Sequence, residues 1–121
     1  MHWLLVAAGG AVGALSRYAI DRAVNAYMGP TVLGIFLINI TGSFLLGVFA
    51  TAYDASEWPV STRFLIAVGF FGSYTTFSTL TVASVQLAQN GDMMRAALNI
   101  LGSIVVGLAA AFAGILVGRA L

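Results

Sequence analysis

The chain has 121 residues, of which 60% are hydrophobic and only 7% are charged, with a formal net charge of +1 and a mean hydropathy of +1.00. Soluble domains carry about a quarter charged residues, so this composition excludes a water-soluble globule and predicts a protein that lies in lipid. The absence of cysteine excludes disulfides and thiolate metal sites, and we expect no nucleic-acid partner.

Four stretches are long and apolar enough to cross a membrane, which takes about 20 residues. In chain order, we expect helices near residues 3–25, 32–53, 62–89 and 95–119. Turn residues separate them: "MGP" from Met28, "SEWP" from Ser56 and "NGD" from Asn90. The first helix lacks the basic start and the small-residue cleavage site of a signal peptide. Residues 1–121 are therefore predicted to form a single all-α, four-helix transmembrane domain.

The first helix contains one charge well inside it, Arg17. Its side chain can extend toward the nearer membrane surface and pair with Asp21 one turn on, or it can attract anions into a vestibule. The residues leave both interpretations open. Asp21 is also the first acidic residue of the chain, and it lies near the far end of this helix. A small multidrug exporter, an alternative with the same size and topology, needs a carboxylate earlier in the helix, so the sequence disfavours it.

The charged residues of the loops hardly indicate in which orientation the chain inserts into the membrane. Arg63 and Arg119 lie on one side of a four-helix topology, Arg22 and Arg95 lie on the other, and lysine is absent. Because orientation follows the Lys/Arg bias between loops, either a weak bias still decides or copies insert both ways. The second interpretation predicts an antiparallel, dual-topology dimer, which also gives four thin helices more interior to share.

Polar groups inside the second and fourth helices have two possible roles. Asn39, in "LINITGS", can hydrogen-bond a neighbouring helix or present an N–H donor to an anion. Asn99, Ser103 and Gly107 follow one another at intervals of four, which places them on one face of the fourth helix. These three residues form a stripe that can allow close packing against a neighbouring helix, or that can line a transport path.

The third helix carries "GFFGSYTTFSTLT" at residues 69–81, a cluster of hydroxyl groups and glycines inside an apolar run. Single hydroxyls in membrane helices are routine because they bond to the preceding turn, but this density predicts a helix that breaks mid-membrane, near residues 72–77. Unwound backbone at that depth is tolerated where it is buried in protein or lines a cavity. The other possibility is an unbroken helix whose hydroxyls face its neighbours.

The three long uncharged runs contain no Asp, Glu, Lys or His. A proton-coupled carrier usually places such a group in the membrane, and no set of residues supports an enzyme. A structural subunit whose polar groups only pack helices stays open. Phe77, among the hydroxyls, can contact an anion through the partial positive charge of its ring edge.

The stretch "GSYTTFST" in a four-helix chain resembles the Fluc/CrcB family of small fluoride channels, the fluoride exporters. Three further segments are similar to that family: "GGAVGALSRY", "INITGSFLLG" and "NILGSIVVG". The resemblance covers nearly the whole chain. It implies a multi-pass protein of the plasma membrane that exports fluoride passively and confers fluoride resistance, working as an antiparallel homodimer with two pores.

The resemblance also implies site residues. A sodium ion on the dimer axis would be held by the backbone carbonyls of Gly72 and Thr75 from both subunits, and Arg17 matches the arginine of the first helix. The pore residues implied are Asn39, Phe77, Ser78, Thr79, Leu80 and Ser103.

The chain departs from the family at a few positions. Leu80 stands where the family has a second pore phenylalanine, and Asn99 and Gly107 stand where it often has an aromatic residue and a second serine. A leucine has no positive ring edge, so the contact at Leu80 is lost. We expect a working homodimer; the alternative is a half-active or non-conducting subunit that pairs with a paralogue in a heterodimer.

Overall fold

The computed structural model describes all 121 residues, and it contains helices and no strands. Its elements in chain order are α1 (His2–Met28), α2 (Leu33–Asp54), α3 (Val60–Arg63), η1 (Phe64–Phe71), α4 (Gly72–Tyr74), α5 (Phe77–Gln89) and α6 (Met93–Ala120). The elements from α3 to α5 follow one another as a single span, so four apolar helical segments are long enough to cross a membrane. The prediction of an all-α, four-span membrane protein is confirmed.

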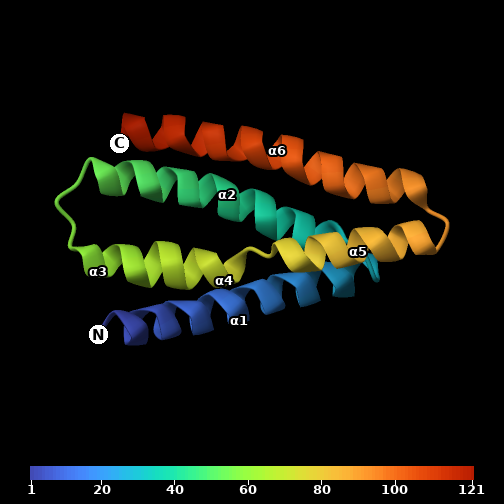
Figure 1. The fold of residues 1–121 in the computed structure, drawn as a ribbon, viewed down its shortest axis with the longest axis horizontal. Coiled ribbons are helices and arrows are strands. Elements are labelled where there is room, and N and C mark those ends of the chain that lie inside the picture. Colours follow the sequence, from blue (N-terminus) through green and yellow to red (C-terminus); the bar gives the residue numbers. More distant parts are fainter.

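The four spans run up and down, and Figure 1 shows both termini at one end of the bundle. The turn between α1 and α2 and the turn between α5 and α6 lie at the other end. Each of these turns contains a glycine with positive φ, Gly29 at 76° and Gly91 at 84°, a region that other residues rarely adopt. Asp92 then caps α6, because its side chain accepts a hydrogen bond from the Arg95 N–H.

Glycines allow the closest helix pairs to form. On α6, Gly114 lies directly against the Phe44 backbone of α2, and on α1, Gly13 lies against the Phe70 backbone of η1. Small residues at helix contacts are the usual means of association in membranes, because lipid supplies no hydrophobic drive between helices. Only 17 of the 121 residues are buried, with Ile38 at the centre, so a single chain has little interior.

The third span is irregular in two ways. Its first half contains a π-helix, η1, which the sequence did not predict. The span then unwinds at two residues with extended backbone, Thr75 (φ −86°, ψ 152°) and Thr76 (φ −147°, ψ 116°). Figure 1 shows this break as the thin loop between α4 and α5. The predicted break in the third helix is confirmed, and the alternative of an unbroken helix is wrong.

Candidate functional site

Asn39 of α2 lies beside the break and pairs with one peptide unit of it. The Asn39 Oδ1 accepts a hydrogen bond from the Thr76 N–H at 2.9 Å, and the Asn39 Nδ2 donates to the Thr76 carbonyl at 3.1 Å. An extended residue has no helical partner for its backbone groups, and unpaired groups in apolar surroundings are costly. Asn39 satisfies both backbone groups of Thr76.

Side-chain hydroxyls bond to further backbone groups at the break. The Thr76 hydroxyl caps α5 by accepting from the Thr79 N–H at 3.3 Å, and it also donates to the Thr79 hydroxyl at 3.1 Å. The Thr75 hydroxyl donates to the Phe71 carbonyl at 3.0 Å. The cluster of threonines in the sequence therefore has a structural role as well as any role in transport. Thr76 was not predicted as a site residue, although it lies within the predicted break.

Arg17 contacts the other side of the break. Its Nε donates to the Ser73 carbonyl at 3.1 Å, while Asp21 packs against Gly34 of α2. The only ion pair of the chain joins Arg95 to Asp92. The proposed pairing of Arg17 with Asp21 is therefore wrong, because a carbonyl at the end of α4 lies within reach and Asp21 is directed toward α2.

Carbonyl groups at the break fall into two sets. Those of Ser73 and Thr76 accept hydrogen bonds from Arg17 and Asn39. The carbonyls of Gly72, Tyr74 and Thr75 accept no hydrogen bond from a side chain. They also accept none of the backbone hydrogen bonds that lie outside the regular helices. The two carbonyls predicted as sodium ligands thus belong to the set that has no such partner.

A hollow of about 270 Å³ lies next to the break, between α2, α5 and α6. It brings together four of the predicted pore residues: Asn39, Phe77, Leu80 and Ser103. Phe77 is 74% exposed in the single chain, whereas Leu80 is 5% exposed and belongs to the core. The Ser103 hydroxyl is buried and has no hydrogen-bond partner, the only buried side-chain polar atom of the chain in this state.

Ser78 and Thr79 lie outside this hollow. Both are exposed on α5 and line a separate, shallow hollow together with Gln86. The structure of one chain therefore does not bring all the predicted pore residues to one place. The stripe on α6 is divided as well: Ser103 lines the hollow at the break, while Gly107 has only the end of the Ile40 side chain near it.

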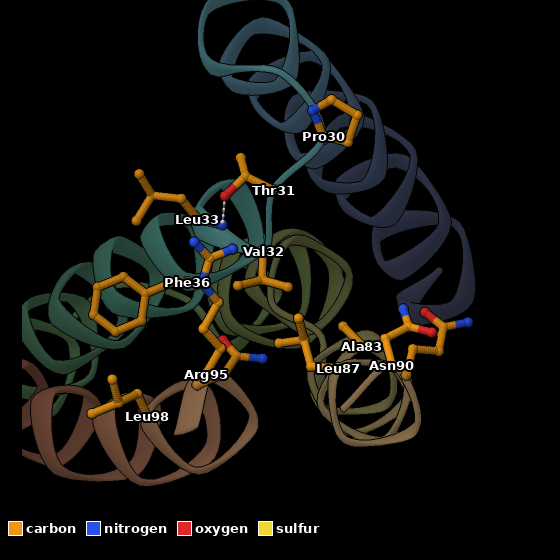
Figure 2. A pocket seen from close by; sticks show the side chains of 12 residues that line it. Pro30, Thr31, Val32, Leu33, Phe36, Ala83, Leu87, Asn90, Arg95 and Leu98 are labelled. Atoms are coloured by element: carbon orange, nitrogen blue, oxygen red, sulfur yellow. Dashed lines mark hydrogen bonds between the residues drawn. The ribbon is translucent and has the colours of Figure 1, made fainter. Parts of the chain in front are cut away.

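Asn99 lies one turn before Ser103 on α6 and lines a larger hollow of about 670 Å³. Its Nδ2 donates to the Ser84 hydroxyl at 2.8 Å, and Ser84 in turn donates to the Leu80 carbonyl. Figure 2 shows this larger hollow, with the Arg95 side chain extending from α6 toward the first residues of α2. Ser84 was not predicted, although its buried hydroxyl on α5 lies four residues after Leu80.

Comparisons with known proteins agree over nearly the whole chain. A family model described as "CrcB-like protein, Camphor Resistance (CrcB)" matches residues 4–115. A protein of Nitrobacter winogradskyi named "Fluoride-specific ion channel FluC" is 40% identical over 98% of both chains. Proteins with that name from Hydrogenobaculum sp. (40% identical over 88% of both chains) and, as "FluC 1", from Streptomyces avermitilis (38% identical over 100% of this chain and 98% of the relative) are also similar.

Proposed function

Since the chain belongs to the CrcB family, we propose that it is a fluoride-selective passive ion channel, and not an enzyme. It exports fluoride from the cytoplasm across the cell membrane, in which it lies as a multi-pass protein. The names of its relatives and the four membrane-length helices support this function.

The observation that carries the proposal is the set of donors at the break. Asn39 has an N–H that no group of the chain accepts, Ser103 has an unpaired hydroxyl, and the Phe77 side chain lines the same hollow. Fluoride is small and strongly hydrated, so a pore must replace its water with short donors. None of these groups is a cation, and weak sites allow an ion to leave as well as to enter.

Passive transport is sufficient for export. Hydrogen fluoride is neutral and crosses lipid, then ionises inside the cell. An inside-negative membrane potential drives the anion outward with about 2.3 kcal/mol per 100 mV. No coupling carboxylate is needed, which agrees with the lack of acidic residues in the three long apolar runs.

The proposed channel is an antiparallel, dual-topology homodimer whose pores are lined by both subunits. Two observations support a dimer: a single chain buries few of its residues, and Phe77, Ser78 and Thr79 are exposed on it. A second copy over α5 would enclose these side chains and bring the two separate hollows into one path. The balanced arginines of the loops support insertion in both directions.

The proposed dimer holds one structural sodium ion on its axis, bound by the carbonyls of Gly72 and Thr75 from both subunits. The chain fits this group, because these carbonyls lie at a break in the third span and accept no side-chain hydrogen bond. The chain has no cluster of acidic or histidine side chains for a metal, and a hard cation is suited by carbonyl oxygens. The ion would offset the repulsion between carbonyl dipoles that meet at the dimer centre.

The function is tested by fluoride efflux from liposomes that contain only this chain, measured with a fluoride electrode, with chloride efflux measured in parallel. Fast fluoride release without chloride release is the expected result. Release of both anions would contradict selectivity. No release from folded dimers would contradict a working homodimer, and co-expression with a paralogue would then test the heterodimer.

A further inference from the structure

We propose that Asn39 is a positioning residue of the helix break: its amide holds the Thr76 peptide group, and this contact sets how its remaining N–H faces the pore. The inference concerns the same site as the proposed function and rests on that function only where transport is measured.

The geometry defines both ends of the Asn39 amide. The Thr76 N–H can only donate and the Thr76 carbonyl can only accept, so Oδ1 faces the first at 2.9 Å and Nδ2 faces the second at 3.1 Å. This two-point contact joins residues 37 positions apart in the chain. It replaces the helical hydrogen bonds that the extended Thr76 backbone lacks.

The face of α2 around Asn39 is built for a close approach to the break. A Cβ atom at Gly42, on the next turn, would lie 3.1 Å from the Tyr74 ring and would overlap the Thr75 side chain. One residue earlier, the Thr41 hydroxyl lies 2.9 Å from the Tyr74 hydroxyl. The second helix is thus tied to Tyr74, which precedes the unwound residues, and to Thr76, the second of them.

The contact between Asn39 and Thr76 affects both the start of α5 and the free N–H of Asn39. Thr76 also caps α5 through its hydroxyl, so a fixed Thr76 fixes the start of the helix that carries Phe77. An amide has two N–H groups, and only one of those on Asn39 is taken by Thr76. The two contacts with Thr76 fix the amide plane, and Asn39 lines the same hollow as Ser103. We infer that the second N–H is available to an anion there.

The test is hydrogen exchange at the Thr76 amide in folded, full-length protein, compared between wild type and three variants. Asn39→Ala removes the acceptor, so exchange at Thr76 should become roughly tenfold faster, as expected for loss of one backbone hydrogen bond. In Asn39→Asp, a carboxyl that stays protonated in these apolar surroundings keeps an oxygen acceptor and an O–H donor for Thr76, so exchange should stay within roughly threefold of wild type. Ser103→Ala is the matched control: it changes the same hollow without touching the break and should leave exchange at Thr76 unchanged.

All three variants should slow fluoride efflux, so the pattern of exchange separates the roles. Unchanged exchange in Asn39→Ala would overturn the proposal and leave Asn39 as a donor only. Fast exchange in Asn39→Asp, or equal acceleration in Ser103→Ala, would also overturn it. If Asn39→Ala does not fold, Asn39→Leu, which has a similar volume and no acceptor, takes its place with the same expected acceleration. The exchange measurement needs no fluoride transport, so it stands even if the proposed function fails.

Discussion

Ser103 offers a test in which stability and transport should move in opposite directions. Its hydroxyl is buried, its side chain is 8% exposed, and no group of the chain pairs with it. An unsatisfied buried polar group costs about 1–3 kcal/mol. Ser103→Ala removes that group, so the free energy of unfolding should stay the same or rise by about 1 kcal/mol.

Fluoride transport should fall in the same variant. A hydrogen bond to a charged partner contributes about 1.5–3 kcal/mol, and about 1.4 kcal/mol corresponds to a factor of ten. Loss of the Ser103 donor should therefore slow fluoride efflux roughly tenfold or more. Thermal melting in detergent and a fluoride electrode with liposomes give the two measurements.

Ser84 supplies the matched control, since it is also a buried serine, 5% exposed, on the neighbouring α5. Its hydroxyl donates to the Leu80 carbonyl and accepts from Asn99. Ser84→Ala leaves the Asn99 amide without its partner and should lower the free energy of unfolding by about 1–3 kcal/mol. If Ser103→Ala destabilises the protein as much as Ser84→Ala does and keeps wild-type efflux, the assignment of Ser103 as a free pore donor is refuted.

Three further predictions concern the ring edge, the helix packing and the cation. Phe77→Leu should slow fluoride efflux roughly tenfold, which corresponds to the upper range for an aromatic edge contact. Size-exclusion chromatography should still show a folded dimer. Normal efflux would contradict the role of Phe77. Gly114→Ala should lower the melting temperature. A Cβ atom at this position would overlap the Phe44 carbonyl and lie 3.2 Å from the Val48 nitrogen, and such overpacking costs about 1–3 kcal/mol. Gly102→Ala on the same helix, with nothing within 4 Å of its Cβ, should melt like wild type, and equal melting of both variants would contradict this packing argument. Replacing Na⁺ by N-methyl-D-glucamine should lower the melting temperature of the dimer, and an unchanged value would contradict a structural sodium ion.

The membrane topology and the break could be predicted because both leave local signals in the sequence. Apolar length identifies spans, and the density of hydroxyls around Thr75 and Thr76 marks the place where backbone groups need other partners. The π-helix η1 left no such signal. Its sequence, "FLIAVGFF", is uniformly apolar, so nothing local distinguishes one hydrogen-bond spacing from the other.

Partners far apart in the sequence were the least predictable part of the site. Arg17 has an acidic residue one turn away, yet it donates to the Ser73 carbonyl, 56 positions away. Asn39 was predicted as a pore donor, and the structure adds its pairing with Thr76. Both contacts depend on how the break lies against its neighbours, which only the tertiary structure reveals. The burial of Leu80 has the same origin, because Leu80 packs into a core that it shares with Ile35 and Ile38 of α2.

Single-channel recording in a planar bilayer, with protein made from this chain alone, tests the central claim most directly. A fluoride-selective channel should give unitary currents that reverse at the equilibrium potential of fluoride and do not change when chloride is varied. Currents that follow chloride, or a folded dimer that carries no current under a fluoride gradient, would contradict it.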